Sequence, residues 1–211
     1  MKITKHEHAY LDIELQGQHL LVDPGVYTPQ LEVQKNVVAI SLSHIHDDHS
    51  YLPHLEKILE QNPNAQLFGP KDVVEKLSGL SVQAVYHGDS FSVGPFTLEF
   101  FGDLHQEIHR SMPIVQNVGI LVNQALYYPG DSYTQPEYPV ELLAMPTSGP
   151  WLRISDVIDY LNAVKPKRSF PTHNALLNDN GHALQNERVK EVTESNGGEF
   201  RYLEVGQSWQ L

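Results

Sequence analysis

The chain has 211 residues, 12 histidines, no cysteine and a formal net charge of −12. A chain of this length fits one domain, which we expect to span residues 1–211, and can bury roughly 70% of its unfolded surface without disulfides. Without cysteine there is no thiolate nucleophile or thiolate metal ligand, so a transition-metal site must use imidazole and carboxylate groups. The negative charge disfavours a general nucleic-acid binder, because such binding depends on clustered Lys and Arg.

Residues 1–15 alternate charged and apolar side chains and lack the apolar core of a signal peptide. No run approaches the roughly 18 apolar residues that a membrane span requires. We therefore expect a soluble, cytoplasmic protein with no membrane partner.

The first half of the chain is predicted to be rich in strands. Residues 9–15 and 19–22 predict a hairpin, which ends at the turn formed by residues 23–25. The apolar run at residues 36–42 predicts a buried strand that stops at a cluster of histidines.

A helix is predicted from His49 to Gln61, because apolar residues recur there at helical spacing. Pro53 falls in its first turn, where proline is tolerated. Asp47 or Asp48 is a candidate for its N-cap.

The rest of the chain continues to mix helices with short strands. Further helices are predicted at residues 71–78, 154–164 and 183–195. Strands are predicted at residues 66–68, 82–86, 96–101, 118–122, 125–128 and 168–171, with a closing hairpin over residues 200–205 and 208–211. Strand-rich halves that each carry helices indicate two sheets packed face to face with helices outside, which is an α+β fold of the four-layer αββα sandwich type.

The pattern with the clearest chemistry is SHIHDDHS at residues 43–50, directly after the predicted buried strand. Residues two apart in extended backbone point the same way, so His44 and His46 can bind one ion together. The turn that follows would direct Asp48 and His49 toward a neighbouring position. One short segment could thus supply ligands to two adjacent metal ions; a solvated polar turn is the alternative.

This H-x-H-x-D-H run resembles the metallo-β-lactamase superfamily, and other landmarks of that family occur in the expected order along most of the chain. These landmarks are Asp23 in LLVDPG, His105 in FFGDLHQEIH, Asp131 in YYPGDS and His173 in SFPTHNAL. The first motif is highly specific, whereas the others carry weight as an ordered set. The stretches Pro129-Gly130-Asp131, Pro150-Trp151 and Pro171-Thr172-His173 look like the compact group that includes the ascorbate-6-phosphate lactonase.

The resemblance implies two divalent metal ions, most simply zinc, with manganese or iron as alternatives. Asp131 would bridge both ions, and Asp23 would orient the histidine loop from outside the ligand set. The remaining implied ligands are His44, His46 and His105 for the first ion and Asp48, His49 and His173 for the second.

Other histidines compete with this assignment. His109 could replace His105 as the third-motif ligand, but we favour His105 because it lies closer to the end of the strand at residues 96–101. His6 and His8 form a second H-x-H pair. No acidic residue or strand end follows that pair in the same way, so we interpret both as part of an ordinary strand edge.

Loop residues near the motifs are candidates for contacts with substrate, namely His109, Arg110 and Trp151. The basic segment at residues 165–168 is a less suitable candidate. It lies at the start of the strand that leads to His173, which places it about 15–20 Å away. We interpret it as a solvated strand entrance.

The resemblance favours a hydrolase in which a hydroxide bridging the two ions attacks a small-molecule ester, lactone or phosphodiester, with Asp48 accepting or relaying the proton. A phosphodiesterase or nuclease acting on nucleic acid is one alternative, but the acidic composition disfavours it. A non-catalytic metal- or ligand-binding module on the same fold is another. We expect a small-molecule substrate and no nucleic-acid partner.

Overall fold

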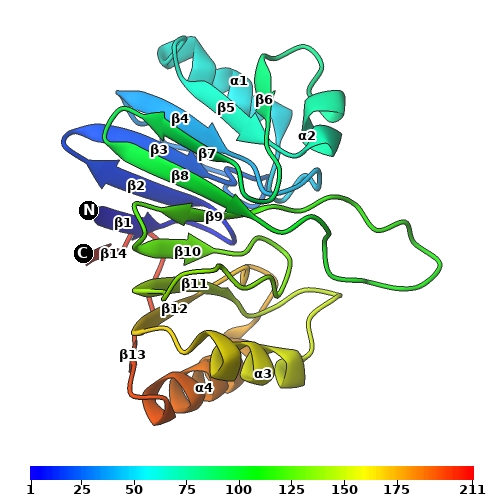
Figure 1. The fold of residues 1–211 in the computed structure, drawn as a ribbon, viewed down its shortest axis with the longest axis vertical. Coiled ribbons are helices and arrows are strands. Elements are labelled where there is room, and N and C mark those ends of the chain that lie inside the picture. The colour runs from blue at the N-terminus through cyan, green and yellow to red at the C-terminus, as the bar shows by residue number, and fades with distance from the viewer.

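The computed structural model describes residues 1–211 and contains two mixed β-sheets (Figure 1). The strands of the first sheet are β1 (Lys2–Lys5), β2 (Leu11–Leu15), β3 (Gln18–Val22), β4 (Val37–Ser41), β5 (Gln66–Gly69), β6 (Val82–Ala84) and β14 (Ser208–Gln210). Their order across the sheet is β14-β1-β2-β3-β4-β5-β6. The N-terminal and C-terminal strands therefore pair with each other at one side of the molecule.

The second sheet also has seven strands, in the order β13-β12-β11-β10-β9-β8-β7. These strands are β7 (Ser90–Val93), β8 (Phe96–Phe101), β9 (Gly119–Val122), β10 (Leu126–Tyr128), β11 (Leu142–Pro146), β12 (Arg168–Thr172) and β13 (Glu199–Phe200). A long loop at residues 102–118 connects β8 to β9 and extends away from both sheets (Figure 1).

The largest core cluster lies between the two sheets, because alternate residues of each strand point inward. In β3, Leu20 and Val22 pack into this central core, whereas Leu21 points to the opposite face. From the second sheet, Phe100 and Ile120 contribute to the same core. The sheets thus pack face to face across an apolar layer.

Helices cover both outer faces (Figure 1). The first sheet is covered by α1 (Leu52–Gln61) and α2 (Lys71–Lys76), and the second by α3 (Ile154–Val164) and α4 (Asp179–Ser195). Together these layers confirm the predicted four-layer αββα sandwich. No helix is both long enough and apolar enough to cross a membrane.

The predicted N-cap of α1 is wrong. Tyr51 occupies the cap position without a side-chain hydrogen bond, and Pro53 lies in the first turn as expected. Asp47 instead pairs with Lys76 at 2.7 Å, and Asp48 turns toward a group of histidines. Neither carboxylate caps α1, and both instead interact with groups around the loop that precedes it.

The predicted closing hairpin is also wrong. β13 pairs in parallel with β12, whereas β14 pairs antiparallel with β1 in the other sheet. The chain crosses between the sheets over residues 201–207, so the two segments do not pair with each other as strands. Three short strands were missed altogether, β1, β7 and β11, and α4 begins four residues early because Asn178 accepts a hydrogen bond from the Gly181 N–H.

Strand direction brings several loops to one edge of the sandwich. β3 and β4 are parallel, and β1 runs the same way because it is antiparallel to β2, which is antiparallel to β3. In the second sheet, β8, β10, β11 and β12 likewise share one direction. The loops after β1, β3, β4, β8, β10 and β12 carry the residues described next.

Candidate metal centre

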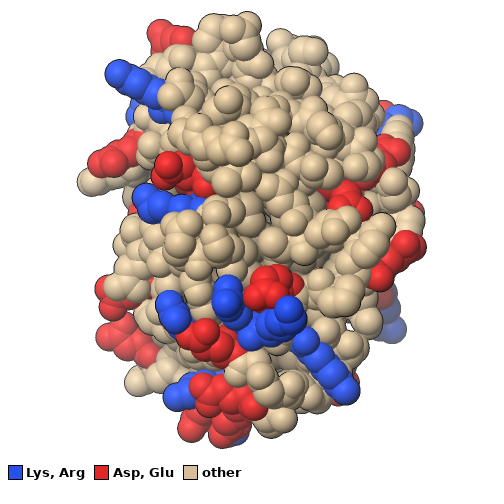
Figure 2. All heavy atoms as spheres, turned by 60° about the vertical axis from the view of Figure 1, so that its left-hand side comes forward, with Lys and Arg blue, Asp and Glu red and all other residues tan.

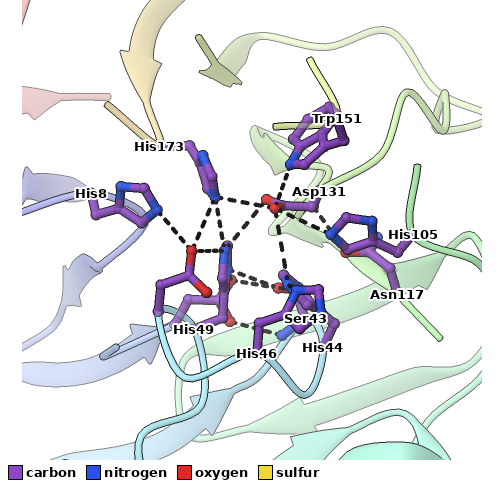
Figure 3. A network of polar contacts seen from close by, with 12 residues as sticks. His8, Ser43, His44, His46, His49, His105, Asn117, Asp131, Trp151 and His173 are labelled. Carbon is purple, nitrogen blue, oxygen red and sulfur yellow. Dashed lines mark hydrogen bonds and ion pairs between the residues drawn. The ribbon is translucent and has the colours of Figure 1, made fainter. Parts of the chain in front are cut away.

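Histidine and aspartate side chains gather where these loops meet (Figure 3). They form three overlapping groups, and within each group the potential ligand atoms all lie within 4.8 Å of one another. The groups are His44, His46 and His105; His8, Asp48, His49 and His173; and His44, His49 and Asp131. All seven side chains that the sequence assigned to metal ligation therefore lie in this cluster.

Asp23 fixes the histidine loop from the end of β3. One carboxylate oxygen accepts a hydrogen bond from the Ser43 N–H at 2.7 Å. The other accepts from the Ser43 hydroxyl at 2.5 Å and lies 2.7 Å from His49 Nδ1. The residue is fully buried, so its ionic hydrogen bonds are not weakened by water. Asp23 thus has the orienting position that the sequence suggested.

Two further contacts hold the same loop. The Lys76 ammonium group on α2 donates to the carbonyl oxygens of Ile45 at 2.5 Å and Ser50 at 3.0 Å, and it also contacts Asp47. Gly25 packs directly against the loop backbone, since a Cβ at this position would lie 1.7 Å from the Asp48 carbonyl oxygen. Only glycine allows the two segments to approach so closely.

The second sheet supplies Asp131, which lies after β10. Its backbone N–H donates to the Asn117 side-chain oxygen at 2.9 Å, and the Asn117 amide group donates to the Pro129 carbonyl at 2.9 Å. The Trp151 indole N–H donates to Asp131 Oδ2 at 2.7 Å. Backbone and side chain of this aspartate are therefore both fixed.

Asp131 lies between the histidine groups (Figure 3). Its Oδ2 is 3.3 Å from His105 Nε2, 4.0 Å from His44 Nε2 and 3.1 Å from His173 Nε2. Its Oδ1 is 3.4 Å from His49 Nε2. One carboxylate thus reaches histidines of both predicted ligand sets.

The hydrogen bonds on the outer nitrogens show which face of each imidazole is free. The Nδ1 atoms of His49, His105 and His173 lie against oxygen acceptors: the Asp23 carboxylate at 2.7 Å, the Gln106 carbonyl at 2.6 Å and the Ser148 carbonyl at 2.5 Å. An imidazole that donates through Nδ1 has, when neutral, an unprotonated Nε2. The same applies to His44, whose Nδ1 is 3.0 Å from a Ser43 hydroxyl that itself donates to Asp23. In their neutral forms, these four rings direct Nε2 lone pairs at the centre of the cluster.

Several inward atoms lack a partner that would satisfy them. His49 Nε2 and His173 Nε2 are 3.1 Å apart, and His44 Nε2 is 3.0 Å from His46 Nδ1. His105 Nε2 and Asp131 Oδ1 are buried without any hydrogen bond. Facing lone pairs and buried unpaired acceptors are costly unless a cation lies among them. The donor set, imidazole and carboxylate, fits divalent transition metals.

The charge states of Asp131, His44 and His46 suit metal binding. Burial opposes ionisation of Asp131, but His173 and His49 beside it hold the pKa of the carboxyl well below its usual range. Burial lowers the pKa of His44 and of His46, which keeps both neutral. Burial also disfavours charge on His173, but Asp131 outweighs it and raises the pKa to about 10. Ionised carboxylates and neutral imidazoles are the forms that bind metals. His44 and His46 are therefore ready to bind, whereas His173 must first lose its proton.

His8 belongs to the cluster, which corrects its interpretation as part of an ordinary strand edge. The residue follows β1, is 2% exposed and has a left-handed backbone with φ of 57°. Its Nδ1 accepts from the Ala175 N–H at 3.3 Å, so its Nε2 carries the proton and donates to Asp48 Oδ2 at 3.1 Å. His8 thus orients a carboxylate, whereas the four histidines placed to donate through Nδ1 direct Nε2 at the centre of the cluster. The sequence signal was β1 itself, whose carboxyl end reaches this edge.

Three of the eight non-glycine residues with positive φ lie at the same place. Asp23 and His173, like His8, have positive φ angles, of 48° and 55°. Such conformations cost a non-glycine residue about 1–3 kcal/mol and persist where the surroundings impose them. The His173 N–H donates to the His8 carbonyl at 2.8 Å, which ties two of these residues together.

A cavity of about 300 Å³ opens above the cluster and reaches His46, Asp48, His105, Asp131 and His173. Trp151, a predicted substrate contact, lines it.

The other two predicted contacts lie elsewhere. His109 and Arg110 are exposed and are not part of the cavity lining, and His109 Nδ1 is 2.7 Å from the Ser111 hydroxyl. His105, rather than His109, is the histidine of this loop that reaches the cluster.

The family model described as "Beta-lactamase superfamily domain" matches residues 2–173, which include all the residues of the cluster. Among curated proteins, Protein Rv0786c of Mycobacterium tuberculosis is 33% identical over 198 residues, covering 92% of this chain and 93% of that protein.

Solved structures share the fold at lower identity. Igni18, a novel metallo hydrolase from the archaeon Ignicoccus hospitalis, is similar with a TM-score of 0.75 and 17% identity, covering 100% of this chain and 98% of that one. The metallo-β-lactamase fold protein YhfI from Bacillus subtilis is similar with a TM-score of 0.76 and 16% identity, covering 99% and 98% of the two chains. Similarity to the ascorbate-6-phosphate lactonase group stays a prediction.

Proposed function

Because the chain belongs to the β-lactamase superfamily of metal-dependent hydrolases, we propose that it hydrolyses a small-molecule ester, lactone or phosphodiester with two divalent metal ions. The observation that carries this proposal is the position of Asp131, whose two carboxylate oxygens reach histidines on both sides of the cluster. A single shared carboxylate between two donor groups is what a two-metal site needs.

The residues divide into two donor sets with Asp131 common to both. His44, His46 and His105 would hold one ion, and Asp48, His49 and His173 the other. Zinc suits this donor set best, with manganese or iron as alternatives. When bound, the ions would acidify a water molecule and polarise the bond under attack.

Asp48 is the protein's candidate for moving the proton. It lines the cavity, and its side chain is 25% exposed, so it can contact both substrate and the attacking water. Burial opposes its ionisation, but hydrogen bonds from His173 and His8 lower its pKa, and the carboxylate stays ionised. An ionised carboxylate is the form that can accept the proton of the attacking water, which Asp48 would then pass to the leaving group.

The surrounding residues position this machinery. Asp23 and Asn117 fix the loops that carry His49 and Asp131. Trp151 restricts the rotation of the Asp131 carboxylate and closes one side of the cavity. Preorganised ligands of this kind lower the cost of ordering the site around substrate.

A small substrate is favoured over nucleic acid. No Lys or Arg lines the cavity. On the face shown in Figure 2, Lys and Arg side chains lie among Asp and Glu side chains rather than in a separate patch. Glu141, for example, pairs with Lys167 at 2.8 Å and with Arg168 at 3.6 Å. A nucleic-acid enzyme needs unpaired cations along the path of the phosphates.

The proposal is tested with metal-loaded protein and a panel of a carboxylic ester, a lactone and a phosphodiester. We expect metal-dependent turnover of at least one of them, abolished in the His46→Ala blank. His105→Ala should lower the rate by at least about a hundredfold, since loss of outer-shell partners alone costs 10–100-fold. His109→Ala, the matched control, should change it little. Stoichiometric metal binding without turnover of any class would instead identify a non-catalytic module.

A further inference from the structure

The cavity beside the metal centre has a polar floor and apolar walls. The floor consists of the cluster residues that line the cavity, namely His46, Asp48, His105, Asp131 and His173. Its volume of about 300 Å³ lies at the lower end of the range for ligand pockets, about 300–1,000 Å³. Apart from the floor and Asp47, all of its lining is apolar: Val26, Tyr27, Ile108, Pro150, Trp151 and Leu176. Such a site holds a small molecule whose reactive group is polar and whose remainder is not.

The walls offer no partner for a charged substituent. The only charged residues that line the cavity are the aspartates Asp47, Asp48 and Asp131. Of the nearby cations, Lys76 is bound to the histidine loop, Arg153 pairs with Asp156 at 3.0 Å, and Arg110 is exposed and does not line the cavity. Proteins that recognise phosphate groups commonly supply Arg or Lys to them. An anionic group outside the reach of the metal ions would meet carboxylates instead.

Exposed apolar side chains are concentrated around this opening. Leu176 is 58% exposed, and Val26 and Tyr27 are each 38% exposed. An adjoining hollow shares His46 and His105 with the main cavity and is lined by Met112 and Ile114, each 48% exposed. These five are among the twelve exposed large apolar residues of the chain. Contiguous exposed apolar surface marks binding sites.

We propose that the site takes an uncharged carboxylic ester or lactone with a hydrocarbon chain, and that the chain lies against Val26, Tyr27 and Leu176. The substrate class rests on the proposed function. Hydrolysis adds the oxygen of water to the acyl carbon, breaks the acyl C–O bond and transfers a proton to the alcohol oxygen. The products are a carboxylate, an alcohol and one released proton.

A small-molecule occupant fits the shape of the surface better than a protein partner. The apolar lining residues come from four separate loops, those after β3, β8, β11 and β12, and they line hollows that share the histidines of the floor. A molecule placed there can contact the walls and the centre at once. Each buried methylene group should increase affinity by about two- to fourfold.

The first test is a binding measurement that needs no turnover. The chain has two tryptophans, and Trp151 lines the cavity whereas Trp209 lies in the central core. In a Trp209→Phe background, the metal-loaded protein is titrated with acetamide, butanamide, hexanamide and dimethyl phosphate while Trp151 fluorescence is recorded. We expect affinity to rise with chain length in the amide series and to exceed that for dimethyl phosphate.

A charge-introducing pair of variants locates the effect. Leu176→Lys should abolish the dependence on chain length, because the ammonium group would lie where the hydrocarbon packs. Leu184→Lys is the matched control, since Leu184 is 56% exposed on α4, away from the cavity. It should leave binding and turnover unchanged. Both residues are exposed, so neither substitution should prevent folding.

Turnover is measured in parallel with p-nitrophenyl acetate, butyrate and hexanoate and with bis(p-nitrophenyl) phosphate. An increase in kcat/KM of about two- to fourfold per methylene, with the esters preferred, supports the proposal. Phosphodiester turnover combined with amide binding that ignores chain length overturns it while leaving the hydrolase intact. Chain-dependent amide binding with no turnover of any ester, lactone or phosphodiester overturns the proposed function and supports the apolar binding site.

Discussion

The floor and the rim of the cavity are built in opposite ways. The floor consists of buried or partly buried His and Asp side chains, several of which are fixed by hydrogen bonds, such as His49 by Asp23 and Asp131 by Trp151. The rim is the set of exposed apolar side chains around the opening, namely Val26, Tyr27, Met112, Ile114 and Leu176. Leu176, for example, is 58% exposed. The floor is therefore rigid and chemically specified, whereas the rim acts only through the surface that it offers.

This difference predicts two kinds of mutational effect. Changes at the floor should remove metal binding or catalysis, because each atom has a defined partner. Changes at the rim should alter affinity in proportion to the apolar area that they remove. The following substitutions test that division, beginning with the largest expected effect.

Gly25→Ala should have the largest effect. It would force the segment that carries the rim residues Val26 and Tyr27 away from the backbone of Asp48 and His49. The added Cβ would lie 1.7 Å from the Asp48 carbonyl oxygen and 2.7 Å from the His49 backbone nitrogen, so the histidine loop must move. We expect loss of metal binding and a fall in stability of about 4 kcal/mol or more. Chemical denaturation and metal titration measure the two effects.

Gly79→Ala is the control for this prediction, since nothing lies within 4 Å of a Cβ at that position. If Gly25→Ala behaved like Gly79→Ala, the close packing of the two segments would not matter for the site.

His8→Ala should weaken metal binding by about 10–100-fold, the usual cost of losing a group that orients a ligand. The imidazole donates to Asp48 Oδ2 at 3.1 Å, and without it the carboxylate is free to rotate. His8→Gln should retain part of the affinity, because it keeps an N–H donor. The matched control is His6→Ala. His6 lies in the same turn, but its ring stacks on Tyr10 and is not part of the group that contains Asp48. Equal effects of His6→Ala and His8→Ala would contradict the orienting role.

Trp151→Phe should lower kcat/KM by about tenfold, since it removes one hydrogen bond to an ionised carboxylate, worth about 1.5–3 kcal/mol before the site relaxes. The bond joins Trp151 Nε1 to Asp131 Oδ2 at 2.7 Å. KM should change less than kcat, because Phe keeps an aromatic wall. A change in KM alone would show that Trp151 acts only as part of the rim.

Metal affinity should rise with pH by up to about tenfold per unit near neutrality. In the metal-free protein, burial lowers the pKa of His173, but Asp131 outweighs it and raises the pKa to about 10, so this histidine holds a proton below that pH. The ion must displace the proton, and lowering the pH therefore opposes binding. Titration calorimetry in buffers of different ionisation enthalpy counts the released protons. No release at pH 7 would contradict this account.

The sequence was most informative about the floor, because ligand chemistry restricts residue type. His44, His46, Asp48 and His49 form one compact motif, and the resemblance placed His105, Asp131 and His173 correctly in the same cluster. His8 was missed because β1, only four residues long, was not recognised. Without that strand, the carboxyl end that brings His8 to the site was invisible.

The rim residues could not be predicted from the sequence, for a different reason. Val26, Met112 and Leu176 lie in separate loops, and an exposed apolar side chain has no required spacing or partner. Arg110 was a reasonable candidate from its position after His105, yet it is exposed and does not line the cavity. Similarly, β13 and β14 read as a hairpin because local pattern does not reveal which sheet a strand joins.

The most direct test of the central claim is the number of metal ions bound per chain. Protein dialysed against zinc and then analysed by elemental mass spectrometry should contain two ions per chain, released in two steps by a competing chelator. Asp131→Asn, which removes the charge shared between the two donor sets, should weaken both steps. A single ion per chain in the unaltered protein, or two ions whose binding ignores Asp131→Asn, would contradict a site built around this carboxylate.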